Sequence, residues 1–243
     1  MFISFEGIDG SGKSTQARRL AETLRAEGRA VVLTREPGGS PGAEQIRHLL
    51  VEGLADRWSP ETELLLFAAA RRDHLERTIR PALDSGAWVI TDRFADSSRV
   101  YQGVTRGDLA GAVNLVHELM IGIEPDATFI IDLDPAKAMA RTARRGAGAA
   151  MCHGPAGVTE ERSGMEAQTS SPGGAPGAAG TGCNPALSPV AGAEERFESM
   201  GLPFQARLRE GFRALAAAHP ARIRLIDGSG DADAVAARVR AAL

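Results

Sequence analysis

The segment from Gly7 to Thr15 constrains the fold of this chain more than any other. It reads Gly-Ile-Asp-Gly-Ser-Gly-Lys-Ser-Thr and matches the pattern G-x-x-x-x-G-K-[ST], directly after the apolar run Phe2–Phe5 and directly before a helical pattern that starts at Lys13. In such a unit the backbone N–H groups of the turn converge on one point, and the dipole of the helix adds positive potential there. The segment predicts a loop that holds nucleotide phosphates mostly through its main chain.

Individual residues of this loop have separate expected roles. Lys13 is expected to reach the β- and γ-phosphates of a nucleoside triphosphate, and Ser14 is expected to bind Mg²⁺. Among 28 lysines and arginines only Lys13 and Lys137 are lysines, so a chain biased toward arginine keeps lysine where the loop requires it. The remaining loop residues that we expect to bind this nucleotide are Gly7, Ile8, Asp9, Gly10, Ser11, Gly12 and Thr15.

The bulk properties of the chain exclude several classes of function. A net charge of −3 and a pI near 6.0 provide no global basic field for nucleic acid, so anion binding must be local. No apolar run approaches the roughly 20 residues of a membrane span, and no charged leader precedes the first strand, so we expect a cytoplasmic protein with no membrane partner. Cys152 and Cys183 do not suggest a disulfide framework.

Short apolar runs alternate with helical patterns along the chain, which predicts one α/β domain over residues 1–243. The runs are nearly continuous in apolar residues, as in parallel strands covered by helices on both faces. The five expected strands are Phe2–Phe5, Ala30–Thr34, Trp88–Thr91, Ala127–Leu133 and Arg222–Ile226. The expected helices are Lys13–Glu27, Gly42–Val51, Pro60–Ser85, Asp108–Gly122, Pro135–Arg145, Glu194–Ala218 and Asp231–Leu243.

One stretch, Ala147–Ala193, differs from the rest in composition. It is rich in Gly, Ala, Pro and Ser and contains no aromatic residue, so it cannot bury enough apolar surface to offset the entropy of ordering. We expect a disordered insertion that lengthens a mobile lid over residues 141–198. Cys152, His153 and Cys183 fall short of a zinc site because their spacing is irregular.

Clusters of polar residues follow the expected strands, where a doubly wound sheet binds its ligands. Together with Phe67 and Arg71, which are four residues apart on one helix, they outline a pocket for a second ligand. The clusters are Arg35-Glu36-Pro37-Gly38-Gly39, Asp92-Arg93-Phe94, Tyr101-Gln102-Gly103 and Asp227-Gly228.

These motifs closely resemble those of the thymidylate kinase family. The resemblance extends over nearly the whole chain except the insertion, and the Arg35–Gly39 run is its most specific part. It implies a P-loop nucleoside-monophosphate-kinase fold with a lid, and phosphorylation of dTMP to dTDP with ATP and Mg²⁺. It also implies a homodimer, for which the apolar faces of Leu64–Leu75 and Leu109–Ile121 are candidates.

The resemblance further implies roles for residues of the acceptor pocket. Asp9 would bind the 3′-hydroxyl of the sugar, whereas Arg35 and Arg93 would hold the acceptor phosphate. Phe67 would stack on thymine and Arg71 would bind its carbonyl edge. The remaining substrate contacts are Tyr101, which would exclude a 2′-hydroxyl, and Glu36, Ser97, Ser98 and Gln102.

Transfer between two phosphates sets the expected catalytic groups. Positioning, Mg²⁺ and cations stabilise the transition state, which suits Lys13 and Arg93. An ionised phosphate acceptor requires no general base, so we assign Asp92 to Mg²⁺ or its waters, together with Ser14. Because Gly10 stands where some family members have an arginine, the resemblance implies a catalytic arginine from the lid. The candidates are Arg141, Arg144, Arg145 and Arg196, of which Arg144 and Arg145 are favoured and Arg196 comes next. The adenine is expected near Arg141 and the loop after Asp227.

Plainer interpretations stay open for several residues. The run Leu64–Phe67 would make good core, and Ser97 and Ser98 are also typical of turns and helix caps. Asp132 and Asp134 suit a metal pair or a cap equally well. The histidines outside the insertion are expected on helix surfaces: His48, His74, His117 and His219.

Two other functions are compatible with a phosphate-binding loop. One is a kinase for another nucleoside monophosphate or for a deoxynucleoside. The other is a nucleotide-dependent regulatory module with a vestigial acceptor site, which leaves the convergence of Arg35, Arg71 and Arg93 unexplained.

Overall fold

A computed structural model describes residues 1–51, 57–105, 108–151 and 200–243, with the backbone alone for residues 145–151. Within these ranges the expected five-stranded sheet is present, and every neighbouring pair of strands is parallel. The strand order is β2-β3-β1-β4-β5, so β1 is central and the glycine-rich loop leaves the middle of the sheet. The strands are β1 Phe2–Glu6, β2 Val31–Arg35, β3 Trp88–Asp92, β4 Ala127–Asp132 and β5 Ile223–Asp227.

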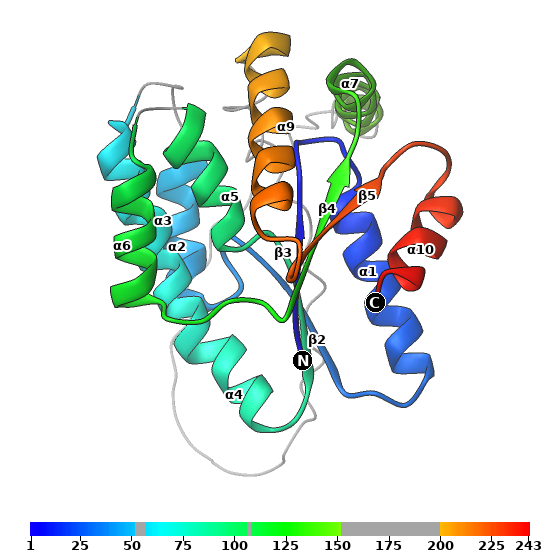
Figure 1. Ribbon diagram of the computed structural model, residues 1–243, viewed down its shortest axis with the longest axis horizontal. Coiled ribbons are helices and arrows are strands. Elements are labelled where there is room, and N and C mark those ends of the chain that lie inside the picture. The colour runs from blue at the N-terminus through cyan, green and yellow to red at the C-terminus, as the bar shows by residue number, and fades with distance from the viewer. Residues whose placement is uncertain (52–56, 106–107, 152–199) are drawn as a thin grey trace, which may run out of the picture.

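Helices cover both faces of the sheet, as the continuous apolar runs predicted (Figure 1). The helices α1 and α10 lie on one face, and α4, α5 and α9 lie on the other, with α2, α3 and α6 beside them. The helices, two of them π-helical, are α1 Lys13–Ala26, α2 Pro41–Val51, α3 Pro60–His74, η1 Leu75–Ile79, α4 Arg80–Asp84, α5 Ala95–Val100, η2 Tyr101–Thr105, α6 Ala110–Met120, α7 Pro135–Met151, α9 Gly201–Ala218 and α10 Ala232–Ala241.

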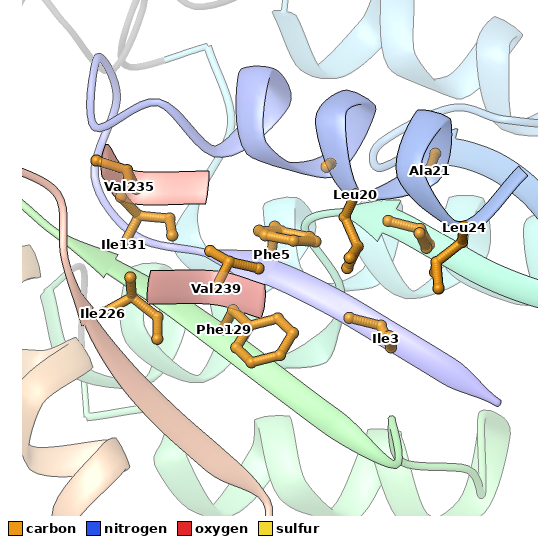
Figure 2. Close-up of a cluster of buried hydrophobic side chains, with 12 residues drawn as sticks. Ile3, Phe5, Leu20, Ala21, Leu24, Phe129, Ile131, Ile226, Val235 and Val239 are labelled. Carbon is orange, nitrogen blue, oxygen red and sulfur yellow. The ribbon is translucent and has the colours of Figure 1, made fainter. Parts of the chain in front are cut away.

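A cluster of apolar side chains fixes the central strand against α1 and α10 (Figure 2). Ile3, Phe5 and Phe129 are completely buried, and Leu20 and Leu24 of α1 pack over them. Burial of each large apolar side chain contributes roughly 1.5–3 kcal/mol. Because β1 is anchored in this way, the glycine-rich loop that follows it starts from a fixed position.

The expected helix Pro60–Ser85 is interrupted by a π-helical turn, which corrects the prediction. Ser59 caps α3 by accepting a hydrogen bond of 3.2 Å from the N–H of Thr62. The helix changes to the π form at Leu75 and returns to the α form at Arg80. Pro81 provides the physical reason, since proline lacks an N–H and clashes with the carbonyl four residues earlier in a regular helix.

The region of the expected insertion is described only at its beginning. Helix α7 continues to Met151, whereas the sequence predicted an end at Arg145 and an insertion from residue 147. Ala147, Ala149, Ala150 and Met151 are good helix formers that can extend an existing helix, although Gly146 and Gly148 are not. Residues 152–199, with Cys152, His153, Cys183 and Arg196, lie outside the described residues, so the expected disorder stays a prediction. Among the described helices, none is long and apolar enough to cross a membrane.

Candidate active site

A pocket lies at the carboxyl ends of β1, β2 and β3. It joins the glycine-rich loop to α3 and α5, so residues far apart in sequence meet in it. All ten residues that the sequence proposed as substrate contacts line this pocket. The lining residues are Asp9, Arg35, Glu36, Arg47, Phe67, Arg71, Asp92, Arg93, Phe94, Ser97, Ser98, Tyr101 and Gln102.

The glycine-rich loop packs tightly against α7. Gly10 has φ of +78°, and a Cβ atom there would lie 2.2 Å from the carbonyl oxygen of Ala138, so no other residue fits without a shift of the helix. An arginine at position 10 would therefore require α7 to lie further from the loop. Lys13 Nζ donates a hydrogen bond of 2.9 Å to the carbonyl of Ile8, and Ser14 is exposed at the start of α1.

Asp9 is the point where the glycine-rich loop meets the pocket. Its Oδ1 accepts a hydrogen bond from Nη2 of Arg93 and lies 3.6 Å from Nζ of Lys13, and its Oδ2 accepts from the hydroxyl of Tyr101 at 3.2 Å. Burial alone would raise the pKa of Asp9, but Arg93 and Lys13 outweigh it and lower that pKa below its ordinary value. Asp9 is therefore an ionised link between the two cations.

Arg93 has a strained backbone that aims its side chain at the loop. Its φ is +74°, which is unfavourable for any residue with a Cβ atom. The conformation is held by its N–H, which donates 2.9 Å to the carbonyl of Phe5, and by its carbonyl, which accepts 2.8 Å from Thr91 Oγ1. The guanidinium also donates to Ser97 Oγ at 3.0 Å. The strain thus places a cation beside Asp9.

Glu6 holds this turn in place, although the sequence analysis did not single it out. It is completely buried, and its two carboxylate oxygens bind the N–H of Phe94 at 2.7 Å and the hydroxyl of Ser97 at 2.5 Å. Burial and then the nearby Asp96 raise the pKa of Glu6 to about 8. A signal was present, because Glu6 is a lone carboxylate at the end of a wholly buried apolar strand.

Arg71 and Glu36 form a buried ion pair on the opposite wall. Arg71 Nε donates 2.7 Å to Oε2 of Glu36, and Nη2 donates to the carbonyl of Phe94 at 3.0 Å and to Ser98 Oγ at 3.1 Å. Burial would raise the pKa of Glu36, but Arg71 and His74 lower it overall. Within the described residues, Nη1 of Arg71 makes no hydrogen bond, so one donor group is left for a ligand.

Two further cations line the rim between the loop after β2 and α2. Arg35 Nη2 donates to both carboxylate oxygens of Glu44, at 3.1 and 3.2 Å, and Glu44 also accepts 2.9 Å from the N–H of Gly39. Arg47 donates 2.7 Å to the carbonyl of Pro37. Arg35 thus lines the pocket while it is bound to Glu44, and Arg47 is a lining residue that the sequence did not indicate.

The remaining pocket residues form its aromatic and amide walls. Phe67 is only half-buried and belongs to none of the core clusters, which favours the ligand-facing interpretation over core packing. The ring of Tyr101 packs edge-on against Phe204 and Phe212. Gln102 is fixed by its amide, which donates 2.7 Å to Glu63.

Asp92 lies where a carboxylate ligand of a metal ion would be expected. It ends β3, lines the pocket, and its Oδ1 is buried with no hydrogen-bond partner among the described residues. A buried carboxylate oxygen without a partner is rare and costly, so it points to an absent ligand or water. Asp132 and Asp134 are engaged otherwise: Asp132 accepts two bonds from Arg209, and Asp134 caps α7.

The arginines of α7 lie beyond the acceptor pocket. Arg141 donates to the carbonyls of Ser11 at 3.5 Å and Gly230 at 3.3 Å, which joins the glycine-rich loop to the loop after β5. Arg144 is exposed on α7, and Arg145 belongs to the part of α7 described by its backbone alone. The structure therefore places Arg141 beside the phosphate loop and leaves Arg144 in solvent.

Two of the four histidines expected on helix surfaces are buried, which corrects the prediction. His74 is completely buried between Thr34 and Glu36, and His117 is nearly buried beside Glu124. Each imidazole has a polar partner in the interior, which allows the burial. His48 and His219 are exposed as expected.

A phosphate-binding loop joined to an arginine-rich pocket for a second ligand, on a parallel α/β sheet, defines a phosphotransferase of the P-loop kinase class. A family profile for thymidylate kinase matches residues 5–153. The chain is 55% identical over 241 residues to the thymidylate kinase of Dinoroseobacter shibae, which covers 99% of this chain and 95% of that protein. It is 52% identical to the thymidylate kinase of Ruegeria pomeroyi, with 98% and 92% covered.

A solved structure gives the same result. The crystal structure of thymidylate kinase from Ehrlichia chaffeensis matches with a TM-score of 0.66 and 31% identity, and the match covers 100% of this chain and 97% of that chain. The chain belongs to the thymidylate kinase family. The resemblance, fold, enzyme class and function expected from the motifs, those of a thymidylate kinase, are thereby confirmed.

Proposed function

We propose that this chain, as a member of the thymidylate kinase family, transfers the γ-phosphoryl group of ATP to the phosphate of dTMP, giving dTDP and ADP. The observation that carries the proposal is the link through Asp9. This residue of the glycine-rich loop is bonded to Arg93 and Tyr101 of the acceptor pocket, so the two nucleotide sites share a wall. Donor and acceptor phosphates would meet at that wall.

The acceptor phosphate is held by guanidinium groups. Arg35, at the end of β2, and Arg93, directly after β3, line the pocket, and their planar guanidinium groups suit phosphate oxygens. Arg93 is positioned on the side of Asp9 and Lys13, where the γ-phosphate enters. Binding of the acceptor would replace part of the hydrogen bonding to Asp9 and Ser97 by contacts to phosphate. These cations stabilise the charge that two phosphate groups bring together.

The thymine base occupies the far end of the pocket. Phe67 offers a half-exposed ring for stacking, and Nη1 of Arg71 offers a hydrogen-bond donor. Arginine only donates, so it favours the carbonyl oxygens of thymine over the amino group of cytosine. Glu36, Ser98 and Gln102 contact or flank this end of the pocket and complete it.

Mg²⁺ is expected with ATP, and the residues present suit it. The hydroxyl of Ser14 is exposed at the phosphate loop, and Oδ1 of Asp92 lacks a partner among the described residues. Both are hard oxygen donors, and Mg²⁺ needs few protein ligands when phosphates and waters supply the rest. When bound, the ion neutralises charge on the transferred phosphoryl group. Asp92 need not act as a base, because the acceptor oxygen is already ionised at pH 7.

The lid is proposed to span residues 141–198 and to supply the catalytic arginine from Arg144 or Arg145. Support comes from α7, which packs against the phosphate loop at Gly10 and carries Arg141 against Ser11 and Gly230. Arg144, about one turn further along α7, is exposed to solvent. Arg141 is proposed to lie against the adenine of ATP.

We also propose that the protein is a homodimer in the cytoplasm. On the neighbouring helices α3 and α6, Leu65 is 62% exposed and Leu119 is 65% exposed, with Leu115 and Met120 beside them at more than half. Such an apolar patch on packed helices suits a twofold contact with a second copy. Sedimentation at micromolar concentration tests it, with Leu119→Glu as the disrupting variant.

A coupled assay of ADP release tests the function. Turnover is measured with dTMP, dUMP, dCMP, dGMP and thymidine, and dTMP is expected to have the highest kcat/KM. A higher value for another acceptor would support the kinase of different specificity. Binding of ATP without any acceptor-dependent turnover would support the regulatory module instead.

A further inference from the structure

His74 ends α3 at a junction of three elements. It is completely buried and lies where α3 gives way to the π-helical turn η1, against the end of β2 and the loop that follows it. Thr78 of η1 donates 2.8 Å to the carbonyl of Gly39 in that loop. A histidine sealed in this position must satisfy both ring nitrogens from protein groups.

Both ring nitrogens of His74 have a hydrogen-bond partner, and these partners determine which nitrogen carries the proton. Nδ1 lies 3.1 Å from Oε1 of Glu36, and Nε2 lies 2.7 Å from Oγ1 of Thr34. Because the pKa of Glu36 is held below its usual value, by Arg71 in particular, its carboxylate only accepts, and the hydrogen-bond network assigns the ring proton to Nδ1. In the neutral ring, Nε2 then accepts from the hydroxyl of Thr34.

The second oxygen of Glu36 continues the chain to the pocket. Oε2 accepts 2.7 Å from Nε of Arg71, whose Nη2 is held by the carbonyl of Phe94 and by Ser98 Oγ. These three hydrogen bonds fix the orientation of the guanidinium group of Arg71. Nη1 is the group left for a ligand among the described residues. The direction of this donor therefore depends on the orientation of the Glu36 carboxylate.

The backbone around His74 is shaped for this contact. Gly39 has φ of +86°, and a Cβ atom there would lie 2.4 Å from both Nε2 of His74 and Oγ1 of Thr34. The loop that carries Glu36 thus closes directly over the imidazole. A side chain in position 39 would separate the Thr34–His74 pair from the loop.

We propose that His74 is a positioning residue for recognition of the acceptor base: anchored on Thr34, it orients Glu36, which in turn aims Arg71 into the pocket. This inference rests on the proposed function, since the base carbonyl of dTMP is the ligand that Arg71 would meet. His74 touches neither substrate, and its effect is on the affinity and selectivity for the base.

Two isosteric replacements test the proposal. In His74→Asn the amide N–H takes the place of Nδ1–H and still reaches Glu36, whereas in His74→Gln the amide takes the place of Nε2 and leaves Glu36 without this donor. We expect His74→Gln to raise the KM for dTMP about tenfold, the effect of one lost charge-assisted hydrogen bond. In His74→Gln the KM for ATP should stay within about twofold of the wild-type value. In His74→Asn the KM for dTMP should stay within about threefold of the wild-type value.

Selectivity separates positioning from a general loss of folding. The ratio of kcat/KM for dTMP to that for dCMP does not depend on the fraction of active enzyme, and we expect it to fall in His74→Gln but not in His74→Asn. In a Glu36→Gln background the His74→Gln exchange should change the KM for dTMP less than about twofold, because the path through Glu36 is already broken.

The outcomes that overturn the proposal are distinct. Equal KM values in the two variants, an unchanged dTMP-to-dCMP ratio, or a full tenfold effect in the Glu36→Gln background would each assign His74 to packing. Wild-type turnover is measured first. Absence of dTMP phosphorylation there would overturn the proposed function and this inference with it, whereas normal wild-type turnover with equal variants overturns only the role of His74.

Discussion

Oε1 of Glu6 accepts a hydrogen bond of 2.7 Å from the backbone N–H of Phe94, and this contact ties the end of β1 to the turn that carries Arg93. The same carboxyl group bonds Ser97 Oγ, so both ends of the turn are held by one side chain. Arg93, with its positive φ, comes directly before the first of these contacts. The central strand thus supplies the phosphate loop at its end and fixes the acceptor cation through its last residue.

Replacement of Glu6 by leucine should release the turn. Glu6→Leu leaves the buried N–H of Phe94 without its acceptor, at a cost of roughly 1–3 kcal/mol. We expect kcat/KM for dTMP to fall at least about 100-fold, since misplacement of a phosphate-binding arginine is costly in phosphoryl transfer. The KM for ATP should change little. Steady-state kinetics in which each substrate is varied, together with a thermal melt, test this prediction. A parallel loss of ATP binding would show a general folding defect instead.

The raised pKa of Glu6 predicts a pH-dependent stability. Between its ordinary pKa of 4.5 and its folded value of about 8, the folded chain holds a proton that the unfolded chain has released. The free energy of unfolding therefore falls as pH rises from about 5 to about 8 and levels off above, by an amount on the order of a few kcal/mol.

Glu6→Gln keeps the shape of the protonated carboxyl group but cannot titrate. Its stability relative to wild type should therefore improve as pH rises across this window, and its activity at neutral pH should stay close to wild type. Urea unfolding of both proteins at several pH values measures the difference in their free energies of unfolding. The titration of all other groups cancels in this difference. A difference independent of pH would contradict the assignment.

Arg93 should be essential for the acceptor. Both Arg93→Ala and Arg93→Gly remove the guanidinium beside Asp9, and we expect kcat/KM for dTMP to fall about 1000-fold with ATP binding retained. The pair also tests strain: alanine at φ of +74° costs roughly 1 kcal/mol that glycine does not, so Arg93→Gly should melt higher. Near-normal turnover in either variant would show that another cation holds the phosphate.

Asp92→Asn tests the proposed contact with Mg²⁺ or its waters. The amide fits the same space but weakens the attraction for a cation, so the Mg²⁺ concentration for half-maximal rate should rise about tenfold, with a lower kcat. Asp233→Asn is a suitable control, because that exposed carboxylate pairs with Arg19 on the surface. A titration of Mg²⁺ at saturating ATP and dTMP provides the measurement, and an unchanged midpoint in Asp92→Asn would sink the assignment.

The sequence predicted the sheet and the pocket because short-range patterns encode them. Apolar runs define buried parallel strands, and polar clusters after those strands meet at one edge by topology alone. His74 was predictable in principle, since it follows Phe67 by seven residues and Arg71 by three and so shares their helix face. The fork of Arg222 on Asp96, at 2.6 and 3.0 Å, joins residues 126 apart, and no local pattern indicates it.

The ring and the hydroxyl of Tyr101 have different contacts, so substitutions at this position can test their roles separately. The ring is held by Phe204 and Phe212, with both centroid distances at 6.4 Å, while the hydroxyl donates 3.2 Å to Asp9 and accepts 3.3 Å from Arg93. Burial raises the pKa of this hydroxyl, so it stays protonated at working pH. If the ring excludes a 2′-hydroxyl, Tyr101→Phe must keep the preference for deoxyribose.

We expect Tyr101→Phe to lower kcat/KM for dTMP only about three- to tenfold, the effect of one lost hydrogen bond of roughly 1 kcal/mol. Tyr101→Leu removes the flat ring but keeps apolar volume, and it should reduce the preference for dTMP over the ribonucleotide by about tenfold or more. The ratio of kcat/KM for the two acceptors is the measurement, because partial unfolding of a variant cancels in it. Equal loss of preference in both variants would transfer the discrimination from the ring to the Asp9–hydroxyl contact.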